Sequence, residues 1–350
     1  MLDWISLENF RNIPAARIDA ASASVGIIGR NGSGKTSILE AIYFLGHGRS
    51  FRSAQRTGLI SRGARMSRVL GSFAPEGVRV GVEFSSSHLE LRMGGESCTL
   101  SQIASQVPIQ LVDPSVHLIV EEGSARRRRL FDWGVFHVEP RFGQEWRVYQ
   151  RALRQRNAAL RAQMWSVDHA LREELQESGE RLHIMRETYF RKLVPVLDVV
   201  LRELLDDDIE IRYRRGWPDD LTLTDALSAV YDRDRRIRTT TVGPHRADLE
   251  LTIASGLARE VVSRGQQKLL ASALVLAQTR LLTSELARSA VLLIDDPAAE
   301  LDVDNLGKLL RAVAKTPAQV VATSLVGSSL DALDIGRMFH VKQGQVTPML

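Results

Sequence analysis

Cysteine, lysine and long apolar segments are all scarce in this 350-residue sequence. Its single cysteine, Cys98, cannot form an internal disulfide, so the disulfide-stabilised secreted domains are excluded. The longest apolar segments, such as residues 290–294, have the length of a strand and fall short of the roughly 20 residues that cross a bilayer. The first residues also lack the apolar stretch of a secretion signal. We therefore expect a cytoplasmic protein with no membrane-spanning segment.

The basic residues are unusual in kind and in distribution. Only six of the 46 are lysine, a bias that a GC-rich genome explains as well as selection for phosphate contacts by guanidinium groups does. No acidic residue occurs between Ala41 and Pro75. That stretch holds a head arginine cluster, a candidate phosphate-binding surface made of Arg49, Arg52, Arg56, Arg62, Arg65 and Arg68.

Two further arginine groups lie in the middle of the chain. Residues 126–129 are four consecutive arginines, a pattern that is more often a solvated or ion-paired helix face than a DNA contact. The second group is a better candidate, as well suited to binding DNA or a partner subunit as to being a plain solvated face. It shares one face of a predicted helix and consists of Arg147, Arg151, Arg154 and Arg161, here called the arm stripe.

Hydrophobic periodicity predicts a head that is interrupted by a helical insertion. Short alternating segments between residues 59 and 100 predict an antiparallel sheet. From Phe142 to Leu204 apolar residues recur every three, four or seven positions, as in long amphipathic helices that fold back near 166–168 or 177–179. We expect an α/β head of residues 1–112 and 238–350 with a β-rich subdomain, and an inserted helical arm of residues 113–237.

A strong phosphate-binding motif follows the predicted strand 25–28 and precedes a predicted helix. It fits G-x-x-x-x-G-K-[ST], in which backbone N–H groups converge on phosphate oxygens. The lysine reaches the β- and γ-phosphates, and the threonine hydroxyl binds Mg²⁺. The motif consists of Gly29, Arg30, Asn31, Gly32, Ser33, Gly34, Lys35 and Thr36.

Two carboxylates supply the partner that such a loop needs. Asp295 and Asp296 directly follow the apolar segment 291–294, which predicts a buried strand. Asp295 is placed to bind Mg²⁺, and Asp296 to orient the attacking water. Together with Lys35, the pair predicts nucleotide hydrolysis.

A second anion site is predicted where a helix begins near Gln266. Ser263 is a good N-cap, Gly265 permits close approach, and the free N–H groups of a helix start attract phosphate. Plain helix capping explains the same residues when they are taken alone. Because one phosphate loop is already present, a site that completes the nucleotide of a second copy is the economical explanation.

The ordered set of motifs resembles the ATP-binding-cassette architecture and, within it, the RecF family of bacterial recombination-repair proteins. The phosphate loop is the one decisive block, and the order and spacing of the others add specificity. The matching blocks are residues 9–12, 29–37, 39–43, 46–52, 127–128 with 131–134, 154–160, 243–249, 263–270, and 295–296 with 300–302.

The resemblance implies a P-loop ABC/SMC-like ATPase head with a short helical arm. It implies ATP and Mg²⁺ as cofactors, an ATP-dependent head-to-head homodimer, and weak DNA-dependent ATP hydrolysis. The substrate would be double-stranded and gapped DNA, bound largely without regard to sequence. RecR and RecO would be partners in loading RecA, in support of replication forks and the SOS response.

The resemblance also assigns roles to residues. Lys35 and Thr36, followed by Ser37, would bind phosphate and Mg²⁺, and Asp295 and Asp296 would be the acidic pair that follows the Walker B strand. Other roles lie outside the loop. The signature acting on the partner's nucleotide would comprise Ser263, Gly265 and Gln266, with Asp302 facing the partner, Gln110 as a Q-loop ligand of Mg²⁺, and Arg11 near the adenine.

The sequence departs from the wider cassette pattern at three places, and the shorter carboxylate and the missing switch histidine among them suggest weak catalysis. Arg264 replaces the usual glycine of the signature, Asp296 replaces a glutamate, and Thr323 and Ser324 stand where a switch histidine is expected. These departures favour the RecF family over the nucleotide-binding subunit of a membrane transporter, which is the main rival. A nucleic-acid scaffold that binds ATP without hydrolysing it is the third interpretation.

Overall fold

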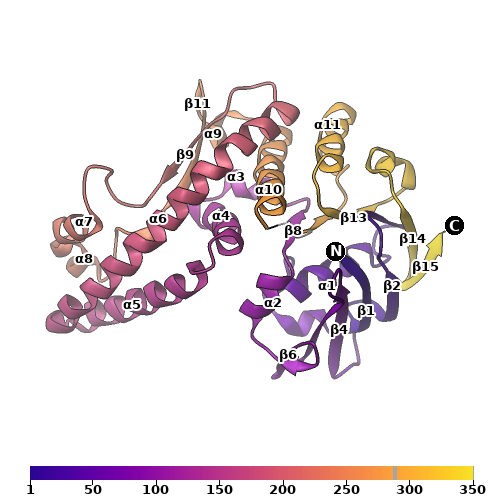
Figure 1. Cartoon of the computed structure of the whole chain (residues 1–350), viewed down its shortest axis with the longest axis horizontal. Helices are drawn as coiled ribbons and strands as arrows, with labels where there is room; N and C mark the ends of the chain where they lie inside the picture. Colours follow the sequence, from indigo (N-terminus) through magenta and orange to yellow (C-terminus); the bar gives the residue numbers. More distant parts are fainter. Residues whose placement is uncertain (287–289, 350) are drawn as a thin grey trace. The chain divides into compact units, whose positions relative to one another are not determined.

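The computed structural model describes residues 1–286 and 290–349, which form two compact units. The first comprises residues 1–117, 202–204 and 268–350, and the second comprises residues 118–201 and 205–267. We expected the insertion to span residues 113–237, whereas the second unit continues to Gln267. In the first unit the N-terminal strands, indigo in Figure 1, lie beside the yellow C-terminal strands.

A six-stranded, mostly parallel sheet organises the first unit, with strand order β15-β14-β3-β13-β12-β8. All neighbours are parallel except β14 and β15. Because parallel strands end at the same edge, the segments that follow β3 and β12 meet there. The strands are β3 (Ser24–Ile28), β8 (Ile109–Val112), β12 (Val291–Ile294), β13 (Gln319–Ser324), β14 (Arg337–Lys342) and β15 (Gln345–Met349).

A second, antiparallel sheet confirms the expected β-rich subdomain, with strand order β2-β1-β4-β5-β6-β7. Its central strands alternate buried and exposed residues, as a sheet with one covered face does. The strands are β1 (Leu2–Phe10), β2 (Ile13–Asp19), β4 (Met66–Phe73), β5 (Val78–Ser85), β6 (Leu89–Met93) and β7 (Glu96–Ser97).

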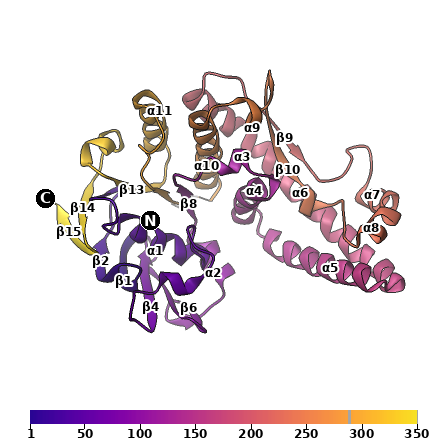
Figure 2. The ribbon, with the colours of Figure 1, turned by 180° about the vertical axis from the view of Figure 1, so that it is seen from behind.

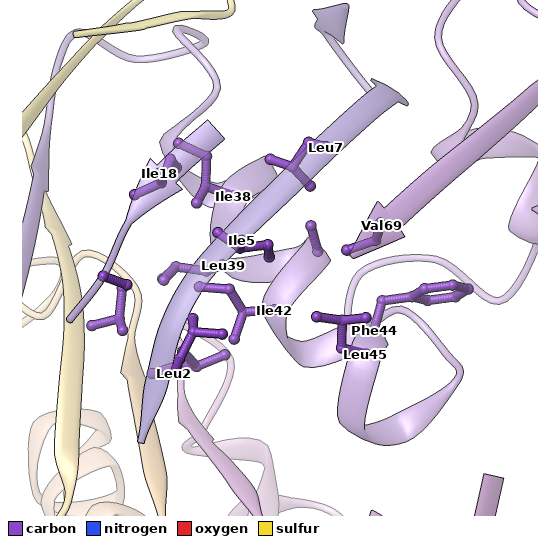
Figure 3. Packing of buried hydrophobic residues seen from close by; sticks show 14 of the residues in the cluster. Leu2, Ile5, Leu7, Ile18, Ile38, Leu39, Ile42, Phe44, Leu45 and Val69 are labelled. Carbon is purple, nitrogen blue, oxygen red and sulfur yellow. The ribbon is translucent and has the colours of Figure 1, made fainter. Parts of the chain in front are cut away.

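Helix α1 (Lys35–His47) packs between the two sheets and contacts β1 and β4 on one side and β8 and β13 on the other. Its apolar side chains are almost fully buried against those of β1, as Figure 3 shows for Ile38, Leu39 and Ile42 beside Ile5. The remaining elements of this unit are helical. They are η1 (Arg56–Leu59), α2 (Leu100–Gln106), α11 (Val303–Ala314), η3 (Gly327–Leu333) and, from Lys268 onward, α10 (Arg264–Leu286).

Gln319, the first residue of β13, ties the two sheets together through its buried side chain. Its Oε1 accepts a 2.6 Å hydrogen bond from the N–H of Leu2, and its Nε2 lies 2.7–2.9 Å from the carbonyl oxygens of Leu2, Ala20 and Ser22. A leucine at this position would break these four hydrogen bonds, after which the Ala20 carbonyl would keep a partner in the N–H of Ser22, at 2.7 Å.

We expect Gln319→Leu to lower the free energy of unfolding by about 2–4 kcal/mol, because each orphaned backbone group costs about 1–3 kcal/mol. Urea denaturation measures this change. The matched control is Gln345→Leu, since Gln345 is exposed on β15. A loss of the same size in both variants would contradict the role of Gln319.

The second unit contains the two long helices that the sequence predicts, α5 (Phe142–Ala162) and α6 (Trp165–Leu204), which run side by side in Figures 1 and 2. The chain turns back at Gln163, which has φ 59°, just before the first of the two expected positions. Gly179, at the second position, lies inside α6, where a Cβ would fall 2.4 Å from the Leu223 side chain. That glycine therefore serves close packing.

The second unit also contains a three-stranded sheet, one strand of which we expected in the head. Strands β9 (Glu210–Arg214), β10 (Asp248–Ile253) and β11 (Gly256–Leu257) pair in the order β11-β10-β9. The strand predicted at 248–253 is confirmed, but it belongs to this unit and not to the head. The other elements are α3 (Leu118–Glu121), α4 (Ser124–Val138), α7 (Leu223–Ala229), α8 (Tyr231–Ile237), η2 (Pro244–Arg246), α9 (Ala258–Val261) and the first turn of α10.

Candidate nucleotide-binding site

The loop between β3 and α1 has the backbone that its glycines predict. Gly29 and Gly34 have φ values of 154° and 121°, and α1 begins at Lys35. A Cβ at Gly29 would lie 2.3 Å from the carbonyl oxygen of Val341, so the tight turn excludes any side chain. The loop and the first turn of α1 form a concave strand–loop–helix cradle of the kind that holds phosphate.

Asn12, at the turn between β1 and β2, holds this loop from outside. Its Nδ2 donates to the carbonyl oxygen of Ser33 at 3.1 Å, and its Oδ1 accepts from the Ser37 hydroxyl at 2.9 Å. The N–H of Gly344 donates to the same Ser33 carbonyl at 2.8 Å. The loop is therefore fixed by two distant turns, and Asn12 is a positioning residue that motif analysis did not single out.

Lys35 points into the loop. Only 7% of this residue is exposed, and its Nζ donates to the carbonyl oxygens of Gly29 at 2.7 Å and Arg30 at 3.2 Å. Burial lowers the pKa of Lys35, while the charges of Asp296 and Asp295 oppose that shift. The ammonium is thus a concentrated positive charge in a largely dry loop, where it would attract phosphate strongly.

The carboxylate of Asp295 lies beside the loop, as predicted. Its Oδ1 accepts hydrogen bonds from the hydroxyls of Thr36 at 3.0 Å and Thr323 at 2.7 Å. Burial raises the pKa of Asp295, and the two hydroxyl hydrogen bonds act against that shift. A hydroxyl and a carboxylate in contact are hard oxygen donors, which fit Mg²⁺ bound together with nucleotide phosphates.

Asp296 begins a sharp turn after β12. It has φ 43°, in the left-handed region that few residues other than glycine adopt, and its N–H donates to the Thr323 hydroxyl at 3.0 Å. Thr323 therefore contacts both aspartates, one through its proton and the other through its oxygen. Thr323 thus orders the acidic pair.

An open pocket of about 510 Å³ connects these groups. Two arginines of the head cluster, the candidate phosphate-binding surface, line this pocket: Arg52 and Arg62. Arg11 also lines it, and its guanidinium holds the buried Glu40 carboxylate through bonds of 2.8 and 2.7 Å. The remaining lining residues are Asn12, Asn31, Gly32, Ser33, Gly34, Lys35, Thr36, Ser37, Asp295 and Asp296.

The sequence is similar over nearly its whole length to proteins of one family. Residues 1–347 match the family described as RecF/RecN/SMC N terminal domain. The DNA replication and repair protein RecF of Shewanella baltica (strain OS155 / ATCC BAA-1091) is 37% identical over 355 residues, which cover 99% of each chain. The RecF of Shewanella piezotolerans (strain WP3 / JCM 13877) is 36% identical with the same coverage. The chain belongs to the RecF family.

Solved structures agree with the fold of this RecF-family chain. The recombination mediator protein RecF-ATP of the RecFOR pathway has a TM-score of 0.88 at 24% identity, over 100% of this chain and 97% of that one. An Smc head domain from Pyrococcus furiosus, with an extended coiled coil and bound to the C-terminal domain of ScpA, has a TM-score of 0.61 at 15% identity. That match covers 99% of this chain and 96% of the other. The fold is therefore that of an SMC-like ATPase head with an inserted arm.

Within this RecF-family fold, Gln110 is the candidate ligand that the geometry does not support. It lies inside β8, opposite Leu292 of β12, and is absent from the pocket lining. Its side chain is buried, and its Nε2 has no hydrogen-bond partner among the described residues. The prediction of Gln110 as a Mg²⁺ ligand came from the resemblance and from its place just before the arm, whereas in the structure Val112 is the residue that ends the strand.

The residues that we expect to act on a partner's nucleotide cap two helices. Ser263 and Gln266 form a reciprocal capping box at the start of α10, with bonds of 3.3 and 2.9 Å. Asp302 caps α11 by accepting a 2.8 Å bond from the N–H of Asn305, which holds the pKa of Asp302 below its usual value. Ser263 and Asp302 are exposed, and neither lines the pocket.

Proposed function

We propose that this chain binds ATP with Mg²⁺ in the pocket of Lys35 and hydrolyses it slowly. The observation that carries the proposal is the meeting of Lys35, Thr36, Asp295 and Asp296 at one edge of the parallel sheet, in a single pocket. Mg²⁺ in such a site would neutralise phosphate charge and polarise the bond that breaks. Thr36 and Asp295 would hold it, and Lys35 would orient the β- and γ-phosphates.

Asp296 is the residue best placed to orient the attacking water. Its carboxylate lines the pocket, and the Thr323 hydroxyl fixes the start of its turn. An aspartate reaches less far than the glutamate of other cassette ATPases, and β13 ends in Thr323 and Ser324 without a histidine. With a shorter carboxylate and no histidine at the end of β13, we expect slow ATP hydrolysis, which suits a protein that changes state on ATP binding.

We propose further that ATP joins two copies head to head. Ser263, Gly265, Gln266 and Asp302 would then complete the partner's nucleotide site. Exposed apolar residues next to these positions support the proposal, because large exposed apolar groups mark interfaces. Val303 follows Asp302 and is 85% exposed, and Val261 near Ser263 is 46% exposed.

We propose DNA as the substrate, with the arm stripe as the contact surface. Trp146 and Gln150 line a shallow groove together with Arg147, Arg151 and Arg154, and all three arginines are exposed. None of the three forms an ion pair with a side chain that the structure describes. The one acidic residue of α5, Glu145, is bound to Arg181 at 2.8 Å. The stripe therefore keeps its positive charge for phosphate.

The head arginine cluster supports DNA binding less well than the sequence suggested. Arg68 is bound to Glu83 at 2.6 Å and to Glu8 at 3.4 Å, while Arg52 and Arg62 line the nucleotide pocket. Three of the six arginines therefore have other contacts or line another site within the same unit, which leaves fewer of them for DNA phosphates.

Replacing Arg147, Arg151 and Arg154 together by glutamine should weaken DNA binding and reduce the slope of log affinity against log salt by up to about 3, since each phosphate contact contributes about 0.9. Salt titration with labelled gapped DNA measures the slope. The matched control replaces Arg126, Arg191 and Arg212, which are each paired with a glutamate. Equal losses in both triple variants would show that net charge alone matters.

The relatives' name and the RecFOR pathway of the similar structure support a role in recombinational repair. We propose that the protein acts at single-strand gaps with RecR and RecO and so assists RecA loading. Support of replication forks and of the SOS response belongs to the same proposal. None of the helices in residues 1–286 and 290–349 has the length and apolar character of a membrane span.

The experiment that tests the function is sedimentation with ATP and gapped DNA, each alone and together, and with lipid vesicles in place of DNA. We expect a dimer with ATP and a larger, ATP-dependent complex with DNA. Binding to vesicles in preference to DNA would favour the transporter interpretation. Dimerisation and DNA binding without phosphate release over hours would favour a scaffold that never hydrolyses ATP.

A further inference from the structure

Lys268 is a buried cation that the proposed mechanism does not use. It lies in the second turn of α10, and only 1% of the residue is exposed. A buried ammonium is costly unless it is hydrogen-bonded and compensated by negative charge. The contacts of Lys268 therefore indicate what the residue does.

The Lys268 ammonium donates to the backbone carbonyl of Ala299, in the segment between β12 and α11. Burial lowers the pKa of Lys268, and negative charges nearby oppose the shift. Those charges come from Glu300, Asp296, Asp113 and Asp295, in decreasing order of effect. The cation thus compensates a group of carboxylates that includes the acidic pair of the pocket.

The segment that Lys268 holds is a strained turn. Asp296 and Glu300 have φ values of 43° and 67°, and the N–H of Ala299 donates to the Asp296 carbonyl at 3.1 Å. Two left-handed residues that are not glycine persist only where surrounding contacts impose them. Thr323 fixes the Asp296 end of this turn, and Lys268 fixes the Ala299 end.

We infer that Lys268 is a positioning residue for Asp296, because it anchors the Asp296–Glu300 turn at the Ala299 carbonyl. The inference rests on the proposed hydrolytic function. It assigns Lys268 no contact with nucleotide, since the residue does not line the pocket. Its loss should therefore slow hydrolysis and leave ATP affinity close to that of the wild type.

A double-mutant cycle with Asp296 tests this coupling in the full-length protein. We expect Lys268→Met to lower kcat about 10- to 100-fold, the cost of a misplaced catalytic group, without a matching loss of ATP affinity. In the Asp296→Asn background the same change should have no further effect on single-turnover hydrolysis. Lys268→Arg, which keeps a charged donor, should restore most of the activity.

The matched control is Lys315→Met, because Lys315 is exposed and bound to Glu203, away from the turn. If Lys268→Met does not fold, Lys268→Gln takes its place in the same cycle. Equal factors in the wild-type and Asp296→Asn backgrounds, or parallel losses of kcat and ATP affinity, would overturn the inference while the wild type still hydrolyses ATP. A wild type that binds ATP and never hydrolyses it would overturn the proposed function, and the inference with it.

Discussion

Lys35→Ala should abolish tight ATP binding. Lys35 is 7% exposed as a residue, and the Gly29 and Arg30 carbonyls aim its ammonium into the loop, so it meets phosphate with little reorganisation. Alanine would lose the two charge-assisted hydrogen bonds that Lys35 is proposed to make to the β- and γ-phosphates. At about 1.5–3 kcal/mol each, their loss predicts an ATP affinity lower by about 10²- to 10⁴-fold. Equilibrium binding of a fluorescent ATP analogue measures the change.

The control for Lys35→Ala is Asp296→Asn, which changes charge in the same pocket without touching the phosphate loop. An amide cannot accept a proton from water, so hydrolysis should slow while ATP binding stays intact. Thermal unfolding without nucleotide should be similar for both variants. Unchanged ATP affinity in Lys35→Ala would remove the basis for the nucleotide site.

The parts of the site that sequence predicted are those that local chemistry determines. The glycines of the loop carry positive φ values that other residues resist, and α1 begins at Lys35, one residue before Thr36, where the motif predicts the helix to start. Asp295 follows four consecutive buried residues, and a run of that kind indicates a strand inside a parallel sheet. Both signals lie within about ten residues of the side chains that they place.

The residues that were missed depend on contacts between distant segments. Asn12 reaches Ser33 because the β1–β2 turn folds under the loop. Arg52 reaches the pocket with its guanidinium 3.9 Å from the buried Glu40 carboxylate of α1, to which the Ser50 hydroxyl also donates. A buried glutamate in the helix after a phosphate loop is the signal that could have located this contact, since such a charge requires a cation nearby.

The second unit shows the same limit for ion pairs. Arginines 126–129 were expected to be solvated or paired with near neighbours, and the Arg126–Glu122 pair agrees. Arg127 instead binds Asp248 on β10 at 2.8 Å. Strand β9 was not predicted, because its alternating pattern is short: only Ile211 and Tyr213 are apolar among five residues, and both are only partly buried. Its pairing with β10 keeps residues 248–267 out of the head.

Ser263→Asp should block ATP-induced dimerisation and leave ATP binding by the monomer unchanged. In the proposed dimer, Ser263 and the first N–H groups of α10 meet the γ-phosphate held by the other copy. An aspartate there repels the phosphate, yet it remains a good N-cap, so the helix start is preserved. Sedimentation with ATP should show monomers at concentrations where the wild type is dimeric.

Two further variants separate charge from structure at the same position. Ser263→Asn keeps the cap without adding charge and should retain dimerisation, whereas Ser263→Arg adds bulk, loses the cap and should fail as the aspartate does. If the Ser263→Asp monomer binds ATP weakly, the helix acts on its own chain's nucleotide and the head-to-head arrangement fails. If dimerisation is unaffected, the α10 start lies outside the interface.

Ser263→Asp should also change how ATP affects DNA binding. ATP would favour the dimer, and a dimer carries two arm stripes, so ATP should raise the DNA affinity of the wild type. In Ser263→Asp this ATP dependence should be lost, while the weaker DNA affinity of the monomer remains.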